Sequence, residues 1–137
     1  MSYKRYIIGF VTIAPPLPEA AIRTVTEFIR REDVTSNVKG LELGRDRLWF
    51  DNDAAWRPGI DGNFSPEAFA AGLAGVMEMI GTAAGSTTDG EFIITWEGLS
   101  GRDHRRSVSI EAGQVRLSGR RVTPAEYEDP EEDDLAP

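Results

Sequence analysis

The chain has no cysteine and only one histidine among its 137 residues. The absence of cysteine excludes disulfide bonds, thiolate metal sites and cysteine nucleophiles, and it leaves the redox compartment undecided. Nucleophilic triads and many metal sites also depend on histidine. The one histidine, His104, stands among arginines in the sequence GRDHRRS, which disfavours its protonated form. We interpret it as an exposed turn residue.

Long apolar runs and phosphate-binding signatures are missing as well. No stretch approaches the roughly 18 apolar residues of a membrane span. The early apolar run leads into prolines rather than into a small-residue cleavage site. Neither G-x-x-x-x-G-K-(S/T) nor a G-x-G-x-x-G after a strand occurs. We therefore expect a cytoplasmic protein with no membrane partner and no cofactor.

The excess of acidic over basic residues is concentrated at one end of the chain. The formal net charge is -8, yet seven of the 23 acidic residues lie in the last twelve positions, EYEDPEEDDLAP. Without those seven, 16 acidic residues stand against 15 Lys and Arg, so the rest of the chain is nearly neutral. A block of like charge with few apolar residues is typical of a disordered end. The sequence predicts one domain over 1–123 and an acidic tail over 124–137.

Apolar periodicity predicts eight elements in that domain. The expected strands cover 3–13, 41–43, 48–50, 92–96, 108–110 and 115–117, and the expected helices cover 18–32 and 65–80. Pro15 and Pro16 end the first strand because proline cannot donate to a strand ladder. We expect a flexible loop over 81–90. The connection over 52–64 is long for a compact domain, and such loops are often functional.

The first strand has two apolar faces. Its alternate positions carry Ile, Gly and Val on one side and Tyr, Ile and Phe on the other. This pattern predicts a central strand that is covered at least partly on both sides, with Gly9 allowing close packing or a bulge. The order β-α-β-β-α-β-β-β predicts an α+β fold. We expect an antiparallel or mixed sheet with two helices on one face, as a ferredoxin-like core with a C-terminal hairpin extension.

The opening stretch YIIGFVTIAPPL resembles the start of small uncharacterised proteins from actinobacteria and their phages. These proteins also begin with a G-x-(I/V)-x-I strand and a Pro-Pro-Leu exit. The matching residues are Tyr3, Gly9, Val11, Ile13, Pro15, Pro16 and Leu17. The resemblance covers about fifteen residues and carries no assigned activity, so it implies an origin, not a function. For a phage protein, the expected location becomes the host cytoplasm.

The clearest charge cluster lies in the last predicted hairpin. It holds six arginines against two acids, a net charge of +4: Arg102, Arg105, Arg106, Arg116, Arg120 and Arg121. Arginine clusters bind phosphates or acidic peptides. Strand alternation would divide these arginines between two faces, and charges on a sheet edge also protect against aggregation. The aromatic residues that would stack bases are missing from this hairpin.

The long connection over 52–64 offers two further candidates. Trp56 is the aromatic residue that we most readily assign to a binding surface. Asp51, Asp53 and Asp61 bring carboxylates that could hold a cation or act as acid and base. An EF-hand is excluded because Ala55 and Trp56 stand where a calcium loop needs an oxygen donor and a glycine. No metal site is expected.

These observations favour a small non-enzymatic protein-interaction module, an accessory or inhibitor protein of phage or actinobacterial origin. Its contacts would come from Trp56 and the arginine hairpin, and its partner would be another protein. The alternatives are binding of nucleic acid or another anionic ligand through the hairpin, a self-associating structural or virion protein, and an enzyme that uses the loop aspartates. The tail would be a solvating end, or it would fold back over the arginines and compete with an anionic ligand.

Overall fold

The computed structural model describes residues 5–31, 36–52, 65–97 and 103–124. Its elements are β1 (Arg5–Ala14), α1 (Glu19–Ile29), the short 3₁₀ helix η1 (Ser36–Val38), β2 (Leu41–Leu43), β3 (Arg47–Phe50), α2 (Pro66–Ala84), β4 (Thr87–Glu97), β5 (Asp103–Glu111), β6 (Gln114–Leu117) and β7 (Arg120–Val122). The strands form one antiparallel sheet in the order β2-β3-β1-β4-β5-β6-β7.

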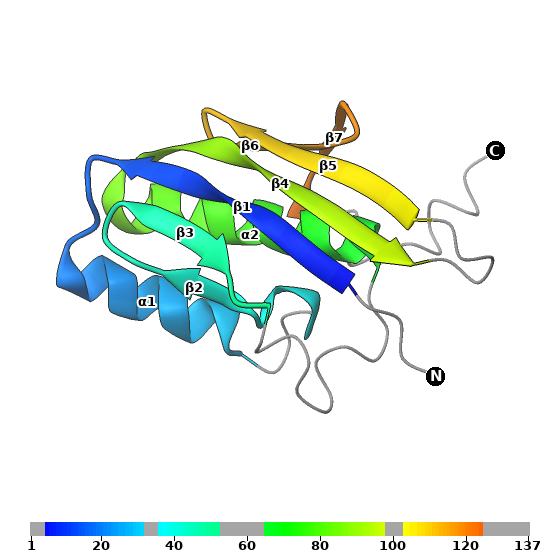
Figure 1. Ribbon diagram of the computed structural model, residues 1–137. Coiled ribbons are helices and arrows are strands. Elements are labelled where there is room, and N and C mark those ends of the chain that lie inside the picture. The colour runs from blue at the N-terminus through cyan, green and yellow to red at the C-terminus, as the bar shows by residue number, and fades with distance from the viewer. Residues whose placement is uncertain (1–4, 32–35, 53–64, 98–102, 125–137) are drawn as a thin grey trace, which may run out of the picture.

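Both helices lie on the same side of this sheet (Figure 1). α1 packs against α2 and β2, and α2 packs against β4, β6 and β7. The predicted α+β class with two helices on one face of the sheet is therefore confirmed. The first six elements, β1-α1-β2-β3-α2-β4, follow the order of the ferredoxin-like pattern, with β1 between β3 and β4. The strands β5, β6 and β7 extend the sheet beyond β4.

The hydrophobic core fills the space between the helices and this face. On β1 the inward positions are Ile7, Val11 and Ile13, all buried. Phe69 of α2 lies fully buried at the centre. Its ring meets Phe50 and Phe92 edge-on, with centroids 5.9 and 5.8 Å away. The helix side of the sheet is therefore closed by aromatic and branched side chains that contact each other directly.

Two glycines let the backbones of β1 and β4 come close together. A Cβ atom at Gly9, which has φ +127°, would lie 2.1 Å from the carbonyl oxygen of Glu91. A Cβ atom at Gly90 would lie 2.3 Å from the carbonyl oxygen of Phe10. Real Cβ atoms do not approach oxygen so closely, so both positions require glycine. The close packing predicted at Gly9 is confirmed.

Asn52 extends the pairing of β1 beyond the end of β3. Its side-chain oxygen accepts a hydrogen bond from the N–H of Ile7 at 2.8 Å, and its amide donates to the carbonyl oxygen of Ile7 at 3.0 Å. The side chain thereby satisfies both backbone groups of Ile7, as a neighbouring strand would. This contact ties the second residue after β3 to the central strand.

The predicted flexible loop over 81–90 is wrong. α2 continues to Ala84 and ends at Gly85, whose φ of +68° is left-handed and whose N–H donates to the carbonyl oxygen of Gly81. β4 already begins at Thr87. The three residues before Gly85 are small, and none is a large apolar residue. The apolar periodicity of the helix therefore does not extend over its last turn.

The C-terminal strands turn through two tight hairpins. Ala112 and Gly113 link β5 to β6 with φ values of +50° and +81°. Ser118 and Gly119 link β6 to β7 with φ values of +50° and +87°. Consecutive positive φ values match the right-handed twist of the strands. The first hairpin was predicted, and β7 was not. Among the described segments, no helix is long and apolar enough to cross a membrane.

Candidate interaction surface

The sheet has a second face, opposite the helices, which we call the open face. On this face four large apolar side chains are exposed: Tyr6 (44%), Ile8 (61%), Phe10 (45%) and Trp49 (41%). Three of them alternate along β1 and the fourth lies on β3. We call this set the apolar patch. The sequence predicts that β1 is covered at least partly on both sides; among the described residues, only the face toward the helices is buried.

Strand register connects the apolar patch to the C-terminal arginines. Residues that stand directly opposite in an antiparallel pair point to the same face. One row crosses six strands of the open face through Trp49, Phe10, Glu91, Ser109, Arg116 and Arg121. A second row runs through Tyr6, Thr95 and Arg105. Since strands lie about 4.8 Å apart, Phe10 and Arg116 are separated by about 14 Å.

The side chains at the centre of the apolar patch contact residues of the neighbouring strands. The guanidinium of Arg47 lies 4.5 Å from the ring centroid of Phe10, which is a cation–π contact. Trp49 stands opposite Phe10 in the register. Ile93 of β4, half-buried, stands opposite Ile8 and continues the apolar surface toward β5. The patch therefore spans three adjacent strands.

The predicted arginine cluster does not lie on one face. Arg105, Arg116 and Arg121 are exposed on the open face. Arg106 and Arg120 stand in register with Ile94 and Leu117, which are buried on the helix side. Alternation has divided the arginines, because neighbouring residues of a strand point to opposite faces. Arg102 lies outside the described residues.

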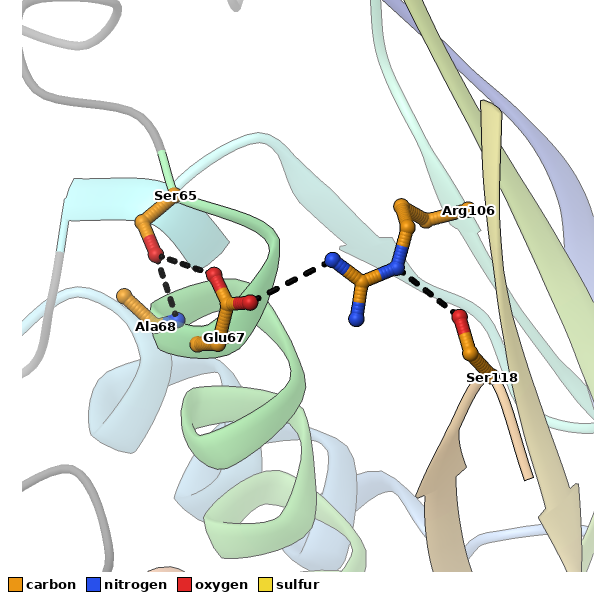
Figure 2. A network of polar contacts seen from close by, with 5 residues as sticks. All are labelled: Ser65, Glu67, Ala68, Arg106 and Ser118. Carbon is orange, nitrogen blue, oxygen red and sulfur yellow. Dashed lines mark hydrogen bonds and ion pairs between the residues drawn. The ribbon is translucent and has the colours of Figure 1, made fainter. Parts of the chain in front are cut away.

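Arg106 has a structural role (Figure 2). Its Nε donates to the hydroxyl of Ser118 at 2.8 Å, and its Nη1 lies 3.3 Å from the carboxylate of Glu67. Glu67 occupies the first turn of α2, and its other carboxylate oxygen contacts Ser65. Ser65 caps the helix by accepting from the N–H of Ala68 at 3.2 Å. Arg106 thus ties the start of α2 to the C-terminal strands.

The charge of Glu67 is stabilised by this network. Partial burial of the side chain raises its pKa, but several contacts act in the opposite direction and outweigh burial. They are a hydrogen bond from its own backbone N–H, hydrogen bonds with Ser65 and Arg106, and the positive charge of Arg106. The net effect lowers the pKa of Glu67 below its ordinary value.

Arg116 and Arg121 form a pair of like charges at the end of the open face. They stand directly opposite each other on β6 and β7, and both are exposed. Like charges in this position destabilise a strand pair. Within the described segments, neither guanidinium has a carboxylate within ion-pair distance. The pair is therefore a concentrated positive charge without a counter-charge in the described part of the chain.

Acidic side chains separate the apolar patch from this arginine pair. Glu91 stands between Phe10 and Ser109 in the shared row and is exposed. Asp89 also lies on β4, where its carboxylate accepts from the N–H of Ala112 at 2.9 Å and so supports the β5–β6 turn. The open face therefore has an apolar part over β1, β3 and Ile93 of β4, an acidic strip formed by Asp89 and Glu91 of β4, and a basic part formed by Arg105, Arg116 and Arg121.

The loop candidates fall largely outside the described residues. Trp56, Asp53 and Asp61 belong to the segment that the structure does not describe. Asp51 follows β3 directly and is half-buried. In the described segments no group of three metal-ligating side chains comes together. His104 is exposed, as predicted, but it lies in β5 rather than in a turn.

Sequence reasoning missed the apolar patch, although it recognised both apolar faces of the first strand. The signal that would have identified the exposed face lies in the neighbouring strands. The positions opposite Ile8 and Phe10 lead outward to Ser107 and Ser109 on β5. A covered face would carry apolar residues at these positions. The comparison of one strand with its partners distinguishes the two faces, whereas one strand alone does not.

No model of a known protein family matches the chain, and neither a curated protein nor a solved structure matches it. The resemblance of its opening strand to actinobacterial and phage proteins therefore stays a prediction.

Proposed function

We propose that the chain is a small non-enzymatic protein-interaction module that binds a partner protein through its open face. The observation that carries this proposal is the exposure of four large apolar side chains on one side of a sheet whose other side packs against the two helices. Isolated exposed apolar residues are ordinary on a protein surface, but a contiguous patch indicates an interaction site. The proposed contact therefore lies on β1 and β3 rather than on the Trp56 loop alone.

The size of the patch fits the centre of an interface. An aromatic side chain buries about 150–250 Å² when it is fully covered. With exposed fractions between 41% and 61%, the four side chains together leave on the order of 400 Å² of surface to water. A partner in a standard interface covers about 800 Å². The patch would supply the apolar core of such an interface, and the surrounding charges would form its rim.

The charged residues around the apolar patch indicate which charges the partner would carry. Arg105, Arg116 and Arg121 are exposed on the side of the patch toward β5–β7, and Glu91 of the acidic strip stands between Phe10 and the arginine pair. A partner with an apolar centre and acidic residues at one side would match this arrangement. Complementary charges would orient the partner and accelerate association more than they would tighten binding.

A site-specific crosslinker tests this function. Photoreactive benzoylphenylalanine is placed at Ile8, at the centre of the open face, and at Arg23, which is exposed on α1. The variants are irradiated in the cells that produce the protein. We expect a discrete adduct to another protein from position 8 and none from position 23. Equal adducts from both positions, or no adduct at position 8, would contradict the proposal. An adduct between two copies would instead support the self-associating alternative.

Nucleic-acid binding is the second candidate, favoured by the occurrence of aromatic rings and arginines on one sheet face. Single strands stack their bases on such rings, and arginines contact the phosphates. Fluorescence anisotropy with a labelled fifteen-residue oligo(dT) tests it. Three arginine–phosphate contacts predict an affinity that falls roughly 20-fold between 50 and 200 mM salt. Binding that is absent, or insensitive to salt, removes this candidate. The acidic strip on β4 argues against nucleic-acid binding, because the carboxylate of Glu91 would lie beneath the bound nucleic acid and repel its phosphates.

A further inference from the structure

Within the described segments, no carboxylate forms an ion pair with the two arginines that face each other on β6 and β7. Arg116 and Arg121 stand directly opposite each other on the open face. Ser109 and Glu111 are the nearest open-face residues of the neighbouring strand β5, and Glu111 stands in register with Gln114, two positions from Arg116. No ion pair links Glu111 to either arginine within the described segments. The repulsion within the pair is thus left uncompensated by the folded body.

The chain itself carries a suitable counter-charge a few residues further on. β7 ends at Val122, and Thr123 and Pro124 follow it, both half-buried. The first acidic residue beyond them is Glu126, five positions after Arg121. An extended segment of five residues spans up to about 17 Å, whereas the two arginines lie about 5 Å apart across their strands. The acidic segment can therefore reach the pair without rearrangement of the sheet.

The composition of that segment matches the surface. Seven of the nine residues over 126–134 are acidic and none is basic. Apart from the acids of the last twelve residues, the chain is nearly neutral, so no other stretch offers a comparable density of negative charge. A segment attached by so short a connection meets the arginines at a millimolar effective concentration. At such a concentration the segment occupies the arginines substantially only when several of its carboxylates contact them together, because a single exposed ion pair is weak.

We propose that the acidic segment 126–134 docks on the Arg116–Arg121 pair of the same chain and so occupies the basic part of the open face. An acidic partner or a phosphate backbone must then displace the segment before it reaches these arginines. The docking is electrostatic and depends on ionic strength, because exposed charges are screened over about 8 Å at physiological salt. This inference does not depend on the proposed function, since it needs no partner.

A spin label tests the docking in the full chain. Because the chain contains no cysteine, the substitution Ala136→Cys provides a single attachment site for a nitroxide. We expect the label to broaden the amide signals of β5 to β7 at 50 mM salt, and the broadening to be lost at 1 M salt. Broadening that is insensitive to salt, or that is equally strong in α1, would overturn the proposal.

A pair of charge-matched variants locates the contact. Arg116→Gln with Arg121→Gln removes the docking surface and should abolish the salt-sensitive broadening. Arg23→Gln with Arg30→Gln removes two exposed arginines at α1, on the other side of the sheet, and should preserve it. Both double variants change the net charge equally, so only the position of the charge differs. Loss of broadening in both would show a general charge effect and contradict the proposal. A negative result in the crosslinking experiment would leave this outcome unaffected.

Discussion

The two faces of the sheet are made by the same strands but differ in how far their apolar side chains are buried. Ile7 and Ile8 are adjacent and chemically identical, yet Ile7 is 1% exposed and Ile8 is 61% exposed. The face toward the helices satisfies its apolar residues within the chain. The open face presents apolar residues that nothing in the described segments covers. One face therefore accounts for much of the stability of the fold, and the other is exposed among the described segments.

The largest expected effect comes from the centre of the covered face. Phe69→Ala removes a fully buried ring that contacts Phe50 and Phe92. We expect the unfolding free energy to fall by about 3–5 kcal/mol, since the lost ring leaves a cavity between two aromatic residues. Urea denaturation followed by circular dichroism measures it. Phe10→Ala on the open face is the matched control, and an equal loss from both variants would mean that the two faces do not differ.

A smaller loss should follow from breaking the side-chain clamp on β1. Asn52→Ala leaves the N–H and the carbonyl oxygen of Ile7 without the partners that lie 2.8 and 3.0 Å away. We expect a destabilisation of about 1–3 kcal/mol, the cost of partly buried polar groups without hydrogen bonds. Amide hydrogen exchange should accelerate at Ile7 more than at Val11. Unchanged protection at Ile7 would show that the clamp contributes nothing.

The covered face was also the part that the sequence predicted best. Alternation and helical spacing identified both helices and six of the strands, because burial on one side imposes a regular pattern. β7 was missed because it has only three residues and ends in a single buried valine. The Ser118–Gly119 dipeptide before it is a turn signal that would have suggested a further hairpin.

The open face was harder to predict for a physical reason. An apolar side chain on a strand has the same pattern whether a helix, a partner or water lies against it. Only the pairing register, which brings polar residues of β4 and β5 beside β1, distinguishes these cases. The register also shows that Arg106 lies on the helix side of the sheet, where it contacts Glu67 and Ser118, and not with the arginines of the open face. Candidate site residues therefore depended on long-range pairing that no local pattern contains.

A still smaller effect is expected from the contact between Glu67 and Arg106, which crosses from α2 to the sheet. The pKa of Glu67 is lowered in the folded protein. Its contribution to stability is therefore complete above the ordinary value of 4.5 and is lost as the pH falls through the lower folded pKa. Because Glu67 is 67% exposed, we expect less than about 1 kcal/mol at pH 7.

A double-mutant cycle over pH measures that contribution. The unfolding free energies of Glu67→Gln, Arg106→Gln and the double variant give the coupling between the two side chains. We expect a favourable coupling at pH 7 that vanishes in acid. A coupling that grows as the pH falls would contradict the assignment of a charged carboxylate, and a coupling that does not change with pH would show that the contact is not ionic.

The smallest change in unfolding free energy is expected for Ile8→Thr, and its comparison with Ile7→Thr contrasts the two faces at adjacent residues. Ile8→Thr keeps a β-branched side chain in the strand and changes only an exposed apolar surface, so the unfolding free energy should change by less than about 0.5 kcal/mol. Ile7→Thr places the same hydroxyl in the core and removes a buried methyl group, which should cost about 2–4 kcal/mol. Thermal and urea unfolding of both variants decide this. If Ile8→Thr destabilised the monomer as strongly as Ile7→Thr, the open face would be covered in solution by part of the chain or by a second copy. If the stability of Ile8→Thr is unchanged, any loss of partner binding in this variant can be assigned to the surface itself, because the fold that presents it is intact.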